Sequence, residues 1–309
     1  MPRLLKLVWL TLLLLPPQWS AGAQPATVAN ETSSGSPHAL SIDADPATPR
    51  LAGEVIYGRK SGMALTYDII QPVERSDANN AAVIFVVSGG WNSNWFPPEN
   101  FRQMGLLRKI HDQGYVLILL RHGSAPRFKV PEAVSDVRLA VRHIRANASQ
   151  IGFDPQRLGI CGASAGGHLS LMMGTTGDDG DPEKEGTVDA AACRVACLVA
   201  YYPPTDLRNM VGPSDRFPAL DFSPNLAESV SPIAHVTDDD APVLLVHGTA
   251  DRLVPLSHSK KLLAEYEKVG LTCELVVLEG AGHGFRGNHA EAAETAVIDW
   301  FNRYLLTDD

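Results

Sequence analysis

The chain has 309 residues, of which 45% are hydrophobic and 20% are charged. This balance is ordinary for a globular protein and excludes a chain that is disordered throughout or collagen-like. Asp and Glu number 35 against 26 Lys and Arg, and no long basic run interrupts the sequence. Nucleic acid is therefore not an expected partner, because phosphate binding needs clustered positive charge.

The first part of the chain carries a targeting pattern followed by a linker. Arg3 and Lys6 precede an apolar run at residues 7–15, and small residues follow, which predicts a secretory signal peptide over residues 1–23. The apolar run is too short for a membrane anchor, which needs about 20 residues. Residues 24–50 are rich in Ala, Ser, Thr and Pro and predict a flexible linker. We therefore expect a secreted or periplasmic protein with no membrane span once the signal is removed.

The remainder, residues 51–309, predicts one α/β domain. Two alternating runs at residues 54–59 and 63–70 predict a β-hairpin. Short β-branched runs predict further strands at residues 82–87, 115–120, 158–161, 195–201, 243–246 and 274–278. Val and Ile recur at helical spacing across residues 131–148, between two of these strands. Strands that alternate with helices predict a mostly parallel sheet with helices on both faces, and ligands in such sheets bind beyond the carboxyl ends of the strands.

One of the predicted strands runs into a G-x-S-x-G motif. Gly162-Ala-Ser164-Ala-Gly166 follows the apolar strand and precedes the small, apolar start of a helix. The two glycines permit a sharp turn that presents a serine hydroxyl above the edge of the sheet. The same residues also fit a Gly-rich turn with a capping serine, so partner residues must decide between a nucleophile and a structural turn.

Two partner residues follow in the order that a serine nucleophile on this type of sheet requires. Asp251 comes just after the strand at residues 243–246, and His283 comes just after the strand at residues 274–278. The order Ser, Asp, His and the strand-end positions both match a catalytic triad. Ser164 is thus the expected nucleophile, His283 the expected general base and acid, and Asp251 the expected orienting carboxylate.

A tetrahedral oxyanion needs backbone donors, and two segments offer them. The N–H of Ala165 directly follows the nucleophile. The loop after the strand at residues 82–87 reads Ser88-Gly-Gly90-Trp91, in which Gly90 or Trp91 is the expected second donor. A simple Gly-Gly turn with a packed aromatic residue is the alternative interpretation of that loop.

These motifs resemble the BD-FAE family of α/β-hydrolases, which is close to the hormone-sensitive-lipase-like carboxylesterases. The resemblance runs from about residue 54 to residue 306. It includes the G-x-S-x-G turn around Ser164, the segment that carries Asp251 and the segment that carries His283. It implies an α/β-hydrolase fold and a serine carboxylesterase. One departure stands out: where these enzymes usually show His-Gly-Gly, this sequence has Ser88 before its two glycines, which puts the fine geometry of that loop in doubt.

The substrate is expected to be a small-molecule or carbohydrate ester, and acetyl or feruloyl esters fit an exported enzyme. A small cap over Ser164 is predicted at about residues 203–240, with Trp91 and Trp95 beside it as substrate-binding residues. His168 is a candidate for substrate contact, although a structural role in the helix also fits. No cofactor and no metal ion are expected, the four cysteines are expected to be buried free thiols, and the oligomeric state is left open.

Two other functions fit the same residues. A serine peptidase of the prolyl-oligopeptidase kind shares the triad, but about 50 residues before the first strand cannot form the propeller domain that such enzymes usually carry. A binding protein on an inactive hydrolase fold is the other alternative. It is suggested by Ser88 and by the unusual segment Arg121-His122-Gly123-Ser124.

Overall fold

The computed structural model describes residues 51–73 and 78–306. The predicted signal peptide and linker lie outside the described residues. The strands are β1 (Leu51–Lys60), β2 (Met63–Ile70), β3 (Ala82–Val86), β4 (Val116–Leu120), β5 (Leu158–Ala163), β6 (Cys197–Tyr201), β7 (Val243–Gly248) and β8 (Cys273–Leu278). The α-helices are α1 (Gly105–Asp112), α2 (Val130–Ala146), α3 (Ala148–Ile151), α4 (Ala165–Thr175), α5 (Ser257–Val269) and α6 (Asn288–Leu305).

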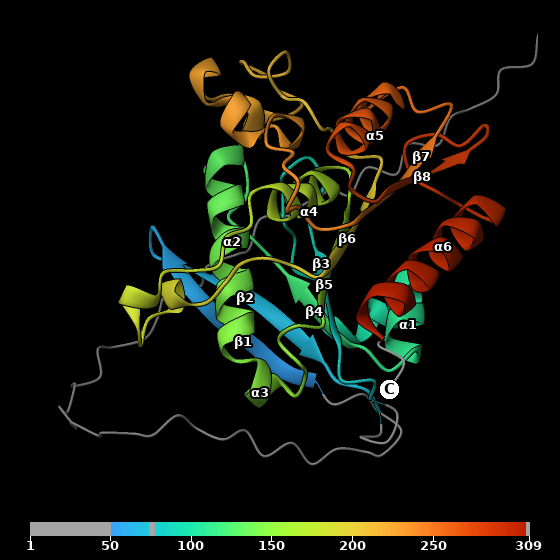
Figure 1. Ribbon diagram of the computed structural model, residues 1–309. Coiled ribbons are helices and arrows are strands. Elements are labelled where there is room, and N and C mark those ends of the chain that lie inside the picture. Colours follow the sequence, from blue (N-terminus) through green and yellow to red (C-terminus); the bar gives the residue numbers. More distant parts are fainter. Residues whose placement is uncertain (1–50, 74–77, 307–309) are drawn as a thin grey trace, which may run out of the picture. The chain divides into compact units, whose positions relative to one another are not determined.

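The eight strands form one sheet in the order β1-β2-β4-β3-β5-β6-β7-β8 (Figure 1). β1 pairs with β2 and β2 with β4 in antiparallel fashion, and all remaining pairs are parallel. The predicted hairpin is present: Lys60 faces Met63 across a two-residue turn. Ser61 and Gly62 have φ values of 48° and 80° there, since such turns favour positive φ at both central residues. The predicted α/β fold with a mostly parallel sheet is confirmed.

The strand predictions agree with the structure to within a few residues at each end. The largest extension is in β1, which begins three residues early at Leu51, because its pairing with β2 continues to Ile70. The single helix predicted at residues 131–148 is two helices, α2 and α3. Asn147 separates them with φ −106° and ψ 14°, which interrupts the regular helical turn.

Two apolar cores lie on the two faces of the sheet. Helices α2, α4 and α5 contribute to one core, and α1 and α6 contribute to the other, as their positions in Figure 1 indicate. Every residue of α4 is buried, so this helix lacks the polar face of a surface helix. The helix that begins directly after Ser164 is therefore held firmly against the sheet.

The parallel strands give the sheet two distinct edges. We call the edge where β3 to β8 end the carboxyl edge, and the edge where they begin the opposite edge. β2 runs the other way, so its first residues, from Met63 to Thr66, lie at the carboxyl edge. Side chains from loops far apart in the sequence therefore meet at the carboxyl edge.

The segment expected to form a cap, residues 203–240, has no α-helix. It contains short 3₁₀ turns at Pro218–Leu220, Pro224–Leu226, Glu228–Val230 and Pro232–Ala234. Lys129, just before α2, donates to the carbonyl oxygen of Pro218 at 2.8 Å and fixes the segment at its first 3₁₀ turn. Three of these turns begin with Pro, which suits the first position of a helical turn because no N–H is needed there.

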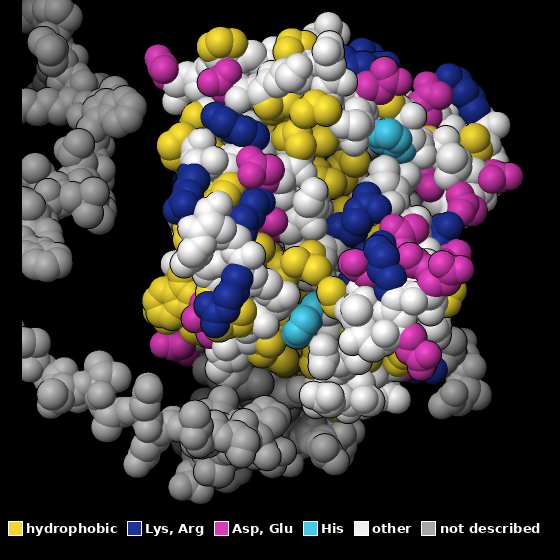
Figure 2. Space-filling view, turned by 90° about the vertical axis from the view of Figure 1, so that its left-hand side faces the viewer, with side chains coloured by type: hydrophobic (Ala, Val, Ile, Leu, Met, Phe, Trp, Pro, Cys, Tyr) yellow, Lys and Arg dark blue, Asp and Glu magenta, His cyan; other side chains and the backbone are white. Residues whose placement is uncertain are grey.

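The outer surface mixes charges of both signs. On the face in Figure 2, Lys and Arg side chains alternate with Asp and Glu, and hydrophobic patches lie between them. That face therefore offers no continuous positive surface. Within residues 51–73 and 78–306, no helix has the length and apolar character needed to cross a membrane.

Candidate active site

Ser164 occupies the sharp turn between β5 and α4, at the carboxyl edge. Its φ is 54° and its ψ is −116°, a conformation that is costly for a residue with a side chain. Gly166 allows the close approach of this turn to β3, because a Cβ there would lie 2.6 Å from the carbonyl oxygen of Val86. At Gly162 a Cβ would lie 2.4 Å from the backbone of Gly166. The strand, turn and helix expected around the motif are therefore present and hold the hydroxyl at the end of the sheet.

Ser164, His283 and Asp251 form a continuous chain of hydrogen bonds. Nε2 of His283 lies 3.0 Å from Oγ of Ser164, and Nδ1 of His283 lies 2.7 Å from Oδ2 of Asp251. Because a carboxylate only accepts, Nδ1 is assigned the proton and Nε2 the lone pair that faces the serine hydroxyl. The three residues come from three different loops, and the fold brings them together in the geometry of a nucleophile, its base and an orienting acid.

The Asp251 carboxylate is buried and well supplied with hydrogen bonds. Its Oδ1 accepts from the backbone N–H groups of Leu253 and Val254 at 2.9 and 3.0 Å, which leaves Oδ2 for His283. His247 also lies close, with Nε2 3.5 Å from Oδ2, but that nitrogen is 2.8 Å from the carbonyl oxygen of Val254. Burial lowers the pKa of His247, so the ring stays neutral and does not compete as a cation for the carboxylate.

Tyr202 packs against the base and was not singled out by the sequence. Its ring centroid lies 4.5 Å from that of His283, and it also packs edge-on with Phe285, with 4.9 Å between the ring centroids. Burial raises the pKa of Tyr202 to about 12, so the phenol stays protonated. Its φ of 35° is strained for an aromatic residue. Its position directly after β6, at the carboxyl edge, is the signal that could have identified it.

The loop after β3 leaves two amides free beside the nucleophile. Gly89 and Asn92 exchange two backbone hydrogen bonds of 2.9 and 3.0 Å, which closes a tight turn. The central residues, Gly90 and Trp91, have φ values of 57° and 58°. No described residue accepts a hydrogen bond from either central amide, and the first N–H of α4, on Ala165, has no partner within its helix. The expected oxyanion donors are thus unpaired, and the turn favours Gly90 and Trp91 over Gly89.

The side chains of Trp91 and His168 lie inside the protein rather than in a substrate cleft. Trp91 is 4% exposed, and its Nε1 donates to Nδ1 of His168 at 3.2 Å. His168 is fully buried, and its Nε2 donates to the carbonyl oxygen of Val230 at 2.7 Å. The expected substrate contacts of these two side chains need correction, because both polar groups are already occupied. The structural role considered for His168 fits its position, and Trp91 keeps only its backbone N–H for the site.

Trp95 lies in a different setting, with 58% of its surface exposed. It lines a cavity of about 370 Å³ at the carboxyl edge, on the β2 side of the loop after β3. The polar part of the lining includes Glu54, Thr66, Ser93, Arg121, His122 and Ser124. Arg121 is buried, bonds to the Asp68 carboxylate and lies 3.5 Å from Glu54. Trp95 is therefore an open aromatic surface beside a polar wall.

Other chemically notable residues have structural roles. All four cysteines are free thiols, and Cys161, Cys193 and Cys197 are buried as expected, whereas Cys273 is partly exposed. Asp178, in the acidic stretch after α4, is held by Arg138 and Arg142 of α2. Among the described residues, no group of three or more His, Cys, Asp or Glu side chains is arranged to hold a metal ion.

The strand order, the serine turn and the loops at the carboxyl edge define an α/β-hydrolase. The BD-FAE family model matches residues 67–266, well over half of the chain. The protein therefore belongs to the BD-FAE family.

Comparisons with known proteins point to the same activity. Esterase LipC of Mycobacterium tuberculosis is 26% identical over 291 residues, covering 86% of this chain and 70% of LipC. The match to esterase LipQ and to the probable carboxylic ester hydrolase LipM of the same organism spans only 56% and 52% of the length of those proteins. A truncated carbohydrate esterase from gut microbiota superposes with a TM-score of 0.67 at 26% identity, over 85% of this chain and 99% of that one. Thermogutta terrifontis esterase 2 phosphorylated by paraoxon superposes with a TM-score of 0.67 at 26% identity, over 88% of this chain and 100% of that one. Family and relatives together indicate a carboxylic-ester hydrolase.

Proposed function

We propose that this carboxylic-ester hydrolase works through an acyl-enzyme formed on Ser164. Oγ attacks the ester carbonyl carbon while His283 Nε2 takes the hydroxyl proton, and the carbonyl oxygen becomes an oxyanion facing the amides of Gly90, Trp91 and Ala165. The alcohol leaves with the proton from His283. Water then attacks the acyl carbon by the same route and releases the acid. The observation that carries this proposal is the unbroken pair of contacts, 3.0 and 2.7 Å, from the hydroxyl to Asp251.

The proposed substrate class is the ester of a carbohydrate with a small acyl group. The support is the cavity at Trp95, where an exposed indole face adjoins hydroxyl, carboxylate and guanidinium groups. Sugar rings present apolar C–H faces to aromatic rings and hydroxyls to polar neighbours, so this wall suits a sugar better than a long lipid chain. The cavity adjoins the loop that carries the oxyanion donors, so a sugar there can belong to the same substrate molecule.

The proposed location is outside the cytoplasm, after removal of residues 1–23. The charged, apolar and small-residue order of this segment supports export. N-terminal sequencing of the protein recovered from the periplasm or medium of an expressing bacterium should begin near residue 24. Recovery of the intact chain from the cytoplasm alone would contradict export.

The nucleophile is tested with Ser164→Ala and a fluorophosphonate probe. Wild type should hydrolyse a short-chain aryl ester and take up the probe at Ser164, while the folded variant should do neither. Retained hydrolysis by Ser164→Ala would refute the assignment. An intact wild-type protein that neither turns over esters nor reacts with the probe would favour a binding protein on the same fold.

The substrate class is tested with Trp95→Ala on two substrates. Loss of the indole should lower kcat/KM for an acetylated oligosaccharide by about 3- to 10-fold, the worth of one aromatic stacking contact. The same variant should leave kcat/KM for a short aryl ester within about twofold. Equal losses on both substrates would contradict a sugar-binding role, and cleavage of a peptide amide faster than either ester would favour a peptidase.

A further inference from the structure

Two histidines outside the proposed triad contact the loop that carries the oxyanion donors. We call residues 88–93 the oxyanion loop and residues 121–125, which follow β4, the support loop. His122 belongs to the support loop, and His168 lies in α4. His122 contacts the side chain of Ser88 at the start of the oxyanion loop. His168 contacts the side chain of Trp91 in the tight turn of that loop.

His122 holds the first residue of the oxyanion loop. Nδ1 donates to the carbonyl oxygen of Gly123 at 2.9 Å, so Nε2 keeps its lone pair and accepts from the Ser88 hydroxyl at 2.8 Å. The ring is 5% exposed, and burial lowers its pKa. A neutral imidazole thus provides one donor and one acceptor, and both are used. Ser88 stands where BD-FAE-like enzymes usually have a histidine, and in this protein His122 supplies an imidazole contact at that position.

The support loop is itself anchored and cross-linked to the oxyanion loop. The Gly123 N–H donates to Asp136 of α2 at 2.9 Å, and Asp136 is paired with Lys60 at 2.8 Å. Oγ of Ser124 accepts from the Ser93 N–H at 2.8 Å, at the far end of the oxyanion loop. Both ends of the oxyanion loop are therefore fixed to one rigid neighbour that is built on β4 and α2.

His168 holds the turn from the other side with the reverse arrangement of ring nitrogens. Nε2 donates to Val230 in the segment 203–240, and Nδ1 accepts from the Trp91 indole. Burial lowers the pKa of His168 to about 4, so the ring is neutral at ordinary pH. A protonated Nδ1 would have no lone pair for the Trp91 N–H.

We propose that His122 and His168 are positioning residues that hold the amides of Gly90 and Trp91 in place for the oxyanion. The inference rests on the proposed function. Two consecutive residues with positive φ, one of them Trp, form a strained turn that persists only when its surroundings fix it. Oxyanion stabilisation depends on donors that are already in place, and a displacement of about 1 Å can cost about 100-fold in rate.

The test is a double-mutant cycle between Ser88→Ala and His122→Leu, assayed with a short-chain aryl ester. Each single variant should lower kcat by about 10- to 100-fold and change KM by less than about threefold, because the ground-state ester does not use the oxyanion donors. The double variant should be no slower than the worse single variant, since both remove the same hydrogen bond. His122→Gln, whose amide oxygen can still accept from Ser88, should keep part of the kcat that His122→Leu loses.

The second side of the turn is tested with Trp91→Phe, which keeps a ring and removes the N–H, and with His168→Leu. Both should lower kcat with little change in KM, and their double variant should again be non-additive. Ser88→Ala and Trp91→Phe are small changes, so they keep the inference testable if a histidine variant fails to fold.

The matched control is His111→Leu at the opposite edge. His111 is also buried, and its Nε2 lies 3.0 Å from the carbonyl oxygen of Gln71. This variant should lower Tm while leaving kcat within about twofold. Equal kcat losses at equal Tm loss for His111→Leu and His122→Leu would overturn the positioning role. So would an unchanged kcat in folded Ser88→Ala and Trp91→Phe, provided that Ser164→Ala is inactive; activity in Ser164→Ala would instead refute the proposed function.

Discussion

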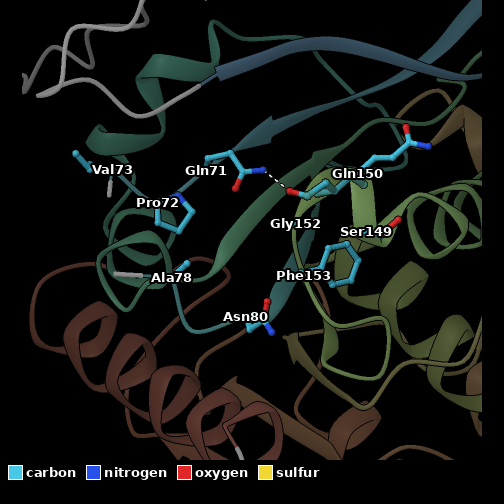
Figure 3. A pocket seen from close by; sticks show the side chains of 10 residues that line it. Gln71, Pro72, Val73, Ala78, Asn80, Ser149, Gln150, Gly152 and Phe153 are labelled. Carbon is cyan, nitrogen blue, oxygen red and sulfur yellow. Dashed lines mark hydrogen bonds between the residues drawn. The ribbon is translucent and has the colours of Figure 1, made fainter. Parts of the chain in front are cut away.

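The two edges of the sheet differ in where they place unusual backbone and in what surrounds it. The opposite edge has the larger cavity, about 700 Å³, which Figure 3 shows lined by Gln71, Asn80, Ser149 and Phe153 among others. None of the described residues that line it, in 51–73 and 78–306, carries a charged side chain. The carboxyl edge has a cavity about half that size, with charged residues and a neighbouring nucleophile. Cavity size alone therefore does not locate the chemistry of this protein.

The two edges also differ in the types of residue that have a positive φ. At the opposite edge, positive φ falls on Asn80 and Gly152, two residue types that adopt it at low cost. At the carboxyl edge it falls on Trp91, Ser164 and Tyr202, for which it is costly. Among residues 51–73 and 78–306, this costly positive φ on large or nucleophilic residues lies at the carboxyl edge, which indicates that the geometry there serves something other than stability.

The largest expected effect is on the acid of the proposed triad. Asp251→Asn should lower kcat by about 10⁴-fold, because an amide N–H in place of Oδ2 would force His283 into the tautomer that cannot accept the serine proton. Asp154→Asn at the opposite edge, where the carboxylate accepts from the Gln156 N–H and lies 3.7 Å from the Arg157 side chain, should leave kcat unchanged. Steady-state kinetics on both variants checks the prediction, and a similar kcat for the two would contradict it.

A methyl group should be far more harmful at one edge than at the other. Gly166→Ala puts a Cβ against the Val86 carbonyl and should lower the free energy of unfolding by about 3 kcal/mol. Gly152→Ala meets open space but keeps a φ of 95°, so it should cost only about 1 kcal/mol. Urea unfolding of the two variants measures the difference. Equal losses would show that the close approach at the serine turn is not needed.

The buried His168 should make stability depend on pH. Its pKa is about 4 in the folded protein against 6.5 in the unfolded chain, so between these values only the unfolded chain binds the proton. The free energy of unfolding should therefore fall as pH decreases from about 6.5 to about 4, by about 3 kcal/mol from this group, and be fully recovered above 6.5. His168→Asn should flatten this decline in urea titrations at pH 7 and pH 5. If the free energy of unfolding of His168→Asn fell with pH as steeply as that of the wild type, the lowered pKa of His168 would not be its cause.

The smallest expected effect concerns the strain at the nucleophile. Ser164→Gly should be more stable than Ser164→Ala by about 1 kcal/mol, because only glycine adopts this φ and ψ without cost. Asn80→Gly, at a position that already tolerates positive φ, should change the free energy of unfolding by less than about 0.5 kcal/mol. Denaturant midpoints decide the matter, and equal stability of the two Ser164 variants would mean that the turn stores no strain.

The linear sequence was sufficient for the strands and for the proposed triad. Apolar runs bounded by Gly and Pro mark strands locally, and the chain order of Ser164, Asp251 and His283 at strand ends follows from the way parallel strands share an edge. The helix at residues 131–148 was correct in place, but its break at Asn147 depends on local backbone angles that a spacing pattern does not reveal.

The side chains around the oxyanion loop could not be assigned from sequence. Ser88 looked like a defect because its partner, His122, is 34 residues away. Trp91 and His168 looked like substrate contacts, and they bond to each other across 77 residues instead. Tyr202 stood next to a strand end without any motif to mark it.

Short-range patterns thus determined the order of strands and helices, the serine turn and the three residues proposed for catalysis, because each depends on neighbours in the chain. Only the tertiary structure decided which amides stay unpaired, which histidines are neutral supports and which tryptophan faces solvent. Those properties depend on burial and on hydrogen-bond partners from distant segments, which come together only when the sheet is formed.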